Sequence, residues 1–306
     1  MRFLRILTFA SLFLIFYISA SGQNNSSDEL YMSLVITPAN SFTTGVEGPA
    51  VDKYGTVYAV NYESPGTIGK ITPDNKAGLF VRLPEGSIGN GIRFDSKGNM
   101  LIADYTMHNI LKVEMSTVKI TVFAHESRMS QPNDIAIDSN DRLYASDPDW
   151  KARKGCFWRI DTDGRTTLLD SIGTANGIEV SPDEKTLYVN ASRSVWAYDL
   201  SPKGEISNKR MLIEFSDFGM DGMRCDIKGN LYIARFGKGA VAVVSPEGNL
   251  IREVQLTGKR PTNVAFGGTD GKTMYVTLQD QGNLECFRVE VPGREWEMQK
   301  KVKTNK

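Results

Sequence analysis

Short apolar runs separated by polar turns recur along the chain from about residue 45 to residue 290. In each unit a polar residue leads an apolar run, a turn and a second apolar run, as in Asn90–Asp95 followed by Met100–Asp104. The unit occurs six times, and its leading residues lie 42 to 45 positions apart. These leading residues are Glu47, Asn90, Asn133, Asn176, Asp221 and Asn263. A period this regular is typical of a repeat architecture.

Each period also holds a third and a fourth strand-like segment. Gly155–Ile160 is an example of the third, and Leu79–Leu83 of the fourth. Four short strands in about 40 to 50 residues make one propeller blade. No convincing long amphipathic helix competes with this pattern. The sequence therefore predicts an all-β fold, a six-bladed β-propeller with four-stranded antiparallel blades around a central metal-containing channel.

A propeller has to close its ring so that no sheet edge is left unprotected. Leu34–Ile36 is a strand-like run that precedes the first repeat. We expect it to supply the outer strand of the sixth blade, which would join the two ends of the chain.

The first residues have the pattern of a secretory signal peptide. Arg2 and Arg5 precede an apolar run from Ile6 to Ile18, and small residues follow up to Gly22. Cleavage there would leave Gln23 as the first mature residue. The alternative is an uncleaved membrane anchor, although the run is shorter than the roughly 20 apolar residues that span a bilayer.

We accordingly divide the chain into four segments and expect a secreted or periplasmic protein without a stable membrane span after cleavage. The segments are a signal peptide at 1–22, a short linker at 23–30, the propeller at 31–296 and a basic C-terminal tail at 297–306.

Composition narrows the possible partners. The 36 basic and 36 acidic side chains cancel, so the sequence offers no bulk attraction to nucleic acid. Its three cysteines, Cys156, Cys225 and Cys286, include no close pair, which matches neither a disulfide framework nor a zinc ribbon. We expect a monomer that acts on a small molecule.

Two sets of polar residues in the repeat have different expected roles. Asp52, Asp95, Asp138 and Asp226 begin turns, where a short carboxylate accepts backbone N–H groups. The leading residues instead begin the innermost strands, so all six are expected to face the channel axis. Two carboxylates and several carboxamides offer hard oxygen ligands, for which Ca²⁺ is the best match. The alternative is that the asparagines only hydrogen-bond the backbone.

Four of these segments resemble the metal-site motifs of the senescence-marker-protein/gluconolactonase family. They are Glu47–Pro49, Pro132–Asp134, Ala175–Ile178 and Asp221–Met223. That family comprises six-bladed propellers that hydrolyse lactones, related more distantly to paraoxonases and diisopropylfluorophosphatase. The resemblance spans about residues 45 to 290.

The resemblance implies a ligand set of Glu47, Asn133, Asn176 and Asp221 around a divalent ion, Ca²⁺ first, with Zn²⁺, Mg²⁺ or Mn²⁺ as alternatives. It also implies that Asp221 is the general base of a metal-dependent hydrolase that opens a lactone ring. A divalent ion stabilises the charge that develops on a lactone carbonyl oxygen when water attacks.

Loops around the channel mouth supply candidates for contact with the substrate. They are Asn90, His108, Asp147, Asp149 and Trp150. An acidic pair beside an indole would suit a polyhydroxylated ring, and Asp147-Pro148 resembles the corresponding loop of bacterial gluconolactonases. The alternatives are that Asp147 only caps its turn and that His108 is a turn or surface residue.

The chain departs from the family pattern at one position. Animal members carry a sugar-binding arginine two residues before the blade-three asparagine, whereas this chain has Gln131. Gluconolactone is therefore in doubt as the particular substrate. Two alternative functions remain, an aryl-ester or organophosphate-type hydrolase on the same metal site and a non-catalytic propeller that binds a partner.

Overall fold

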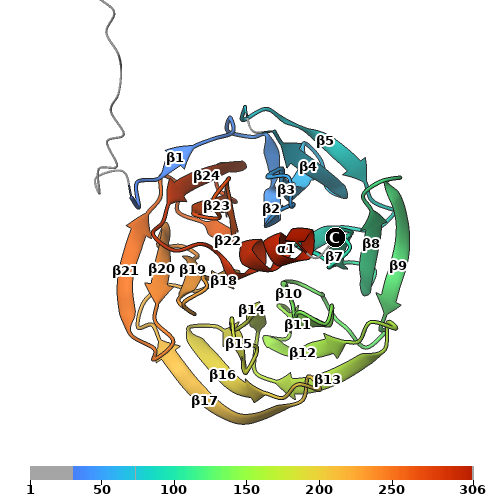
Figure 1. Cartoon of the computed structure of the whole chain (residues 1–306), viewed down its shortest axis with the longest axis vertical. Coiled ribbons are helices and arrows are strands. Elements are labelled where there is room, and N and C mark those ends of the chain that lie inside the picture. Colours follow the sequence, from blue (N-terminus) through green and yellow to red (C-terminus); the bar gives the residue numbers. More distant parts are fainter. Residues whose placement is uncertain (1–29, 73, 305–306) are drawn as a thin grey trace, which may run out of the picture.

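The repeats form six four-stranded antiparallel sheets arranged in a ring, as predicted (Figure 1). The computed structural model describes residues 30–72 and 74–304. The predicted signal peptide at 1–22 lies outside the described residues. In each of the first five blades the strands follow one another from the channel outward in chain order. Every blade thus presents its first strand to the channel.

The strand bounds match the predicted repeats. Blades 1 and 2 consist of β2 (Phe42–Val51), β3 (Val57–Tyr62), β4 (Thr67–Ile71) and β5 (Ala77–Arg82), then β6 (Gly89–Phe94), β7 (Met100–Asp104), β8 (Asn109–Glu114) and β9 (Lys119–His125). Blades 3 and 4 consist of β10 (Ile135–Ile137), β11 (Leu143–Asp149), β12 (Lys154–Ile160) and β13 (Thr166–Ser171), then β14 (Ala175–Val180), β15 (Thr186–Ala191), β16 (Ser194–Leu200) and β17 (Ile206–Glu214). Blade 5 consists of β18 (Met223–Cys225), β19 (Leu231–Arg235), β20 (Ala240–Val244) and β21 (Leu250–Gln255).

The sixth blade joins the two ends of the propeller. Its strands β22 (Pro261–Gly267), β23 (Thr273–Leu278) and β24 (Asn283–Arg288) come from the end of the chain, and its outer strand is β1 (Leu34–Val35). Leu34 pairs with Cys286 and Val35 with Glu285 in antiparallel register. The expected ring closure is confirmed, and it shields the edge of β24 from solvent.

A bulge in the innermost strands decides which side chains reach the channel. In β6 the pairing with β7 shifts by one residue between Gly89 and Ile92. One extra residue turns positions three apart to the same side of the strand, although an undisturbed strand would send them to opposite faces. Asn90 and Arg93 therefore both point inward. The pairing of β14 shifts in the same way between Ala175 and Ile178.

The turn aspartates have the predicted role. One oxygen of each carboxylate accepts two backbone N–H groups across its hairpin turn, for example those of Tyr54 and Thr56 at 2.8 and 3.0 Å for Asp52. The same pair of bonds occurs at Asp95, Asp138 and Asp226. These carboxylates stabilise turns at the end of the channel opposite the leading residues.

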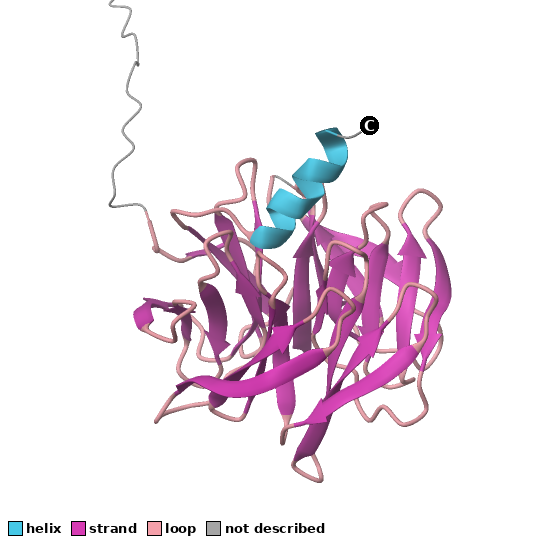
Figure 2. Cartoon of the chain, turned by 60° about the horizontal axis from the view of Figure 1, so that its bottom comes forward, coloured by secondary structure: helices cyan, strands magenta, loops and turns pink. Residues whose placement is uncertain are grey.

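The C-terminal segment contains a helix. Residues Arg294–Thr304 form α1, which includes most of the basic tail expected at 297–306. Figures 1 and 2 show α1 over the centre of the ring, on one face of it. Gln299 donates a hydrogen bond to the backbone oxygen of Val51, and Arg294 donates one to that of Ile137. Both acceptors end innermost strands, so α1 covers the turn end of the channel. No helix in the described ranges is long and apolar enough to cross a membrane.

Ion pairs hold α1 in this position. Glu295 Oε1 lies 2.5 Å from Arg93 Nε, and the Arg93 side chain is fully buried. Arg294 is 3% exposed and donates to Glu184 Oε1 at 2.9 Å. Because the sequence of α1 is strongly polar, these buried ion pairs account for its docking better than an apolar face does.

We predict that Glu295→Ala destabilises the propeller by about 3 kcal/mol, since it leaves the buried Arg93 guanidinium without its nearest partner. The value is at the low end for a broken buried pair because the Glu295 side chain is itself 23% exposed. Urea denaturation measures the difference. Glu297→Ala, on the same helix, is the control and should cost far less. Equal losses in the two variants would contradict this role for Glu295.

Candidate functional site

The six leading residues gather at the channel mouth, at the end opposite α1. Five of them line one cavity of about 450 Å³: Glu47, Asn90, Asn133, Asn176 and Asp221. Asn263 is the exception, because it is fully buried and does not line the cavity. Its Nδ2 donates to Glu47 Oε2 at 3.0 Å, and its Oδ1 accepts the N–H of Val264. Asn263 thus orients Glu47, and the ring that faces the cavity has five members.

Three oxygens of this ring are buried without any hydrogen-bond donor. They are the Oδ1 atoms of Asn90, Asn133 and Asn176. A buried polar atom without a partner is costly, and each such atom in a native protein calls for an explanation. Three of them around one cavity, beside two carboxylates, make a site lined by electron-rich oxygen.

Of the two ring carboxylates, Glu47 is buried and Asp221 is half-buried. Burial and the nearby Asp134 carboxylate raise the pKa of Glu47 to about 7. Burial also raises the pKa of Asp221 well above its ordinary range, and the Glu47 charge adds to the rise. A hydrogen bond from Asn176 acts in the opposite direction on Asp221. Without a counter-charge, ionisation of one carboxyl group disfavours ionisation of the other.

This donor set fits a hard divalent cation. Within the described ranges, no three His, Cys, Asp or Glu side chains gather as a metal site. The cavity instead combines two carboxylates with three free carboxamide oxygens, which are the ligands that Ca²⁺ takes in proteins. A cation there would satisfy the orphaned oxygens and neutralise the paired carboxylates at once.

Glycines after two leading residues let neighbouring inner strands approach closely. A Cβ on Gly48 would lie 1.9 Å from the backbone oxygen of Asn90, and one on Gly222 would lie 1.9 Å from Asn263 Cγ. Any side chain there would push the ring apart. The motif glycines are therefore required by the spacing of the site.

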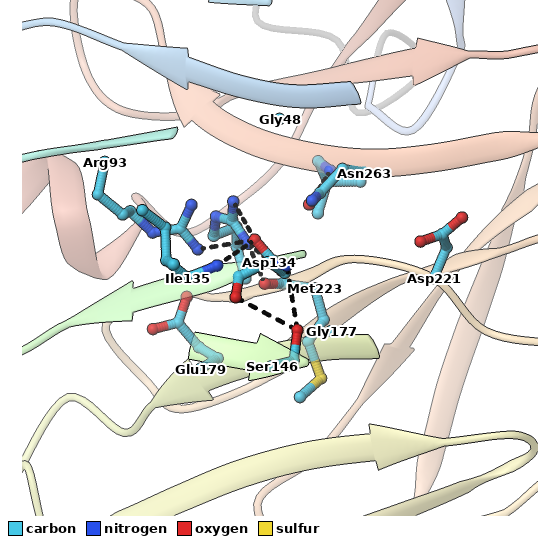
Figure 3. Close-up of polar contacts among 12 residues, drawn as sticks. Gly48, Arg93, Asp134, Ile135, Ser146, Gly177, Glu179, Asp221, Met223 and Asn263 are labelled. Carbon is cyan, nitrogen blue, oxygen red and sulfur yellow. Dashed lines mark hydrogen bonds and ion pairs between the residues drawn. The ribbon is translucent and has the colours of Figure 1, made fainter. Parts of the chain in front are cut away.

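A buried ionic network lies directly beneath the ring, and the sequence analysis did not single it out. Asp134 is fully buried, and its carboxylate accepts two hydrogen bonds from Arg224 at 3.0 and 3.2 Å. Arg93 lies 3.6 Å from the same carboxylate, and the contacts converge on Asp134 in Figure 3. Glu179 also belongs to this layer, where burial and the Glu295 charge raise its pKa to about 7.

The sequence does contain a signal for this network. Arg93, Glu179 and Arg224 each stand three residues after a leading residue, where two other repeats have alanine. Charged residues in the middle of short buried strands are rare unless they are paired. That position of the repeat therefore marks a second inward-facing layer.

The structure corrects the expected role of two rim carboxylates. Asp147 is buried, and its Oδ1 accepts the N–H groups of Ser130 and Gln131 at 2.8 and 2.7 Å. Its Oδ2 accepts the indole N–H of Trp158 at 3.0 Å. Asp147 thus fixes the loop that leads to Asn133 and does not line the cavity. Asp149 lies outside the cavity as well, and its Oδ1 accepts a turn N–H at 2.8 Å.

The remaining rim candidates differ in whether they line the cavity. Trp150 lines the cavity and is 42% exposed. His108 lies in the turn between β7 and β8 with a φ of 58°, and it is not among the lining residues. Asn90 and Trp150 are therefore the two rim candidates that reach the cavity. His108 is a turn residue, which was the alternative given for it.

Comparison with known proteins places these features in a family. The model of the SMP-30/Gluconolactonase/LRE-like region matches residues 46–280. A gluconolactonase of Zymomonas mobilis is 25% identical over 269 residues, which cover 76% of this chain and 75% of that protein. A 6-deoxy-6-sulfogluconolactonase of Pseudomonas putida is 32% identical over 186 residues, covering 54% and 64%.

A solved structure shares the fold. It is a calcium-binding regucalcin of Agrobacterium tumefaciens, with a TM-score of 0.75 and 23% identity over 85% of this chain and 94% of that one. The family model covers all the leading residues of the ring and the repeats that carry them. The chain belongs to the SMP-30/gluconolactonase/LRE-like family.

Proposed function

We propose that this protein is a divalent-metal-dependent hydrolase that opens a lactone ring. The observation that carries the proposal is the cavity in which two carboxylates and three unpartnered carboxamide oxygens meet. Family membership and relatives named as gluconolactonases support the reaction class. A propeller that only binds a partner has no need for two carboxylates that converge on one cavity.

Glu47, Asn133, Asn176 and Asp221 would hold the ion. Ca²⁺ is the first choice because all the donors are hard oxygens, with Mg²⁺, Mn²⁺ and Zn²⁺ as alternatives. A bound divalent cation polarises a lactone carbonyl and stabilises negative charge on its oxygen.

Asp221 is the better placed general base of the two carboxylates. It is half-buried and lines the cavity, whereas Glu47 is only 7% exposed and its Oε2 already accepts two hydrogen bonds. Asp221 takes a proton from water as the water oxygen bonds to the carbonyl carbon. The ring C–O bond then breaks, and the proton passes from Asp221 to the leaving alkoxide. Asn90 can accept a hydrogen bond from the substrate.

We also propose that the protein is secreted or periplasmic. The proposal is supported by the charged, apolar and small-residue pattern of residues 1–22.

The first prediction concerns pH in the cation-free protein. An unfolded glutamate loses its proton near pH 4.5, whereas folded Glu47 keeps it until about pH 7. The folded state then binds more protons over this interval, so the free energy of unfolding should fall as pH rises from 4.5 to 7. Added Ca²⁺ should reduce this fall, because the cation replaces the proton.

Thermal melting across that interval, with chelator and with Ca²⁺, measures the difference. Glu179 titrates in the same direction outside the cavity, so the part of the fall that Ca²⁺ removes is the part that reports the site. Identical pH slopes with chelator and with Ca²⁺ would contradict a cation site at Glu47.

The second prediction compares carboxylates within one repeat. Glu47→Gln should weaken Ca²⁺ binding at least tenfold, since it removes half of the ring's charge. Asp52→Asn, in the turn of the same repeat, should cost about 1 kcal/mol of stability and leave Ca²⁺ affinity unchanged. Calorimetric titration of chelator-treated protein tests both. Loss of Ca²⁺ affinity in both variants at constant fold would refute the assignment.

The third prediction tests the reaction itself. With Ca²⁺, Mg²⁺, Mn²⁺ or Zn²⁺ supplied in turn, proton release should follow from aldonolactones or aliphatic lactones. At saturating metal, Asp221→Asn should lower turnover on the order of 10²- to 10⁴-fold, because asparagine keeps an oxygen ligand but is not a base. This loss should exceed the roughly tenfold loss of metal affinity that removal of one ring charge brings.

Aryl esters and phosphotriesters belong in the same assay. Activity confined to those compounds would favour the alternative hydrolase, and silence on every compound with every metal would favour a binding module. Full turnover in Asp221→Asn would exclude this residue as the base.

A further inference from the structure

The walls of the cavity above the ring are apolar. Tyr105 and Ile88 come from blade 2, and Phe236 and Met220 come from blade 5, which stands opposite blade 2 in a six-membered ring. Trp150 adds an indole from blade 3. A molecule whose reactive carbonyl reaches the ring therefore has aromatic and aliphatic surfaces on two facing sides.

The polar groups in these walls are mostly already paired. Asn61 is 4% exposed, donates to Gly45 O at 2.6 Å and accepts the N–H of Gly66 at 3.1 Å. Thr262 donates to the backbone oxygen of Val46 at 2.8 Å. The Tyr105 hydroxyl oxygen accepts from the Trp150 indole N–H. Above the ring, few groups other than Gln279 and the Tyr105 O–H remain to hold the hydroxyls of a sugar.

The described residues that line the cavity include no cation. Among them there is no Lys, Arg or His, and the charged ones are Glu47 and Asp221. The buried Arg235 near the rim is already paired with Asp217 at 2.5 Å and Glu253 at 3.0 Å. Arg260 lies 5.9 Å from the Phe236 ring centre and does not line the cavity. Anionic sugar lactones therefore find no cationic side chain there.

Gln131 helps to hold one of these walls. Its side chain accepts the backbone N–H of Trp150 at 3.4 Å, which ties Gln131 to the loop that carries the indole.

We propose that this cavity selects lactones whose ring carries an alkyl or aryl substituent, and esters that carry such groups. It discriminates against polyhydroxylated and anionic sugar lactones. The inference rests on the proposed lactonase function and adds a substrate class to it. Each methylene group buried against the walls favours the substrate about fourfold in kcat/KM. Each sugar hydroxyl buried there without a partner disfavours it.

The test compares three lactones with the same six-membered ring on the Ca²⁺-loaded protein. They are δ-valerolactone, δ-decalactone, which carries a pentyl chain, and glucono-δ-lactone. We expect kcat/KM to be at least tenfold higher for δ-decalactone than for δ-valerolactone, and lowest for glucono-δ-lactone. Preference for glucono-δ-lactone would overturn the inference and leave the proposed function standing. No turnover of any lactone would overturn both.

Variants of the walls make the test specific. Trp150→Ala and Phe236→Ala should each lower the ratio of δ-decalactone to δ-valerolactone kcat/KM at least fivefold. Phe218→Ala is the matched control, since Phe218 is 52% exposed and does not line the cavity, and it should leave the ratio unchanged. An unchanged ratio in both wall variants, or an equal fall in Phe218→Ala, would overturn the assignment of these walls.

Discussion

Electrostatic repulsion on the channel axis is the constraint on which the interior of this protein depends. A propeller points the starts of all its inner strands at one axis, and here that geometry brings the Glu47 and Asp221 carboxylates together in a cavity. The arginines of the layer below offset part of this charge, because Arg224 acts to lower the pKa of Glu47. Asp134 holds that arginine with two hydrogen bonds. The carboxylate ring and the ionic layer thus form one electrostatic unit.

The architecture was predictable because it follows from local rules applied six times. Alternating apolar positions and a polar lead fix each blade, with an aspartate turn such as that of Asp52 in four of the six, and the period fixes their number. Five leading residues reach the cavity as predicted, because the sheet of each blade fixes the position at which its inner strand starts. Asn263 differs because it turns to hydrogen-bond Glu47, a long-range contact that no local pattern encodes.

The parts that sequence analysis missed depend on contacts between distant segments. The helix α1 is polar along its length, and its docking relies on partners about two hundred residues away, such as Arg93 for Glu295. Rim residues depend on the path of each loop. Asp147 and Trp150 are three positions apart, yet one is buried in hydrogen bonds and the other faces the cavity. Residue type alone does not distinguish these outcomes.

The placement of α1 closes one end of the propeller channel. The helix covers the turn end of the channel (Figure 2), and buried, paired side chains such as Arg93 fill its middle, so the ring cavity has no passage through the propeller toward α1. Any molecule bound at the ring must leave by the route through which it came. Product must therefore leave the channel mouth before the next substrate molecule can enter it.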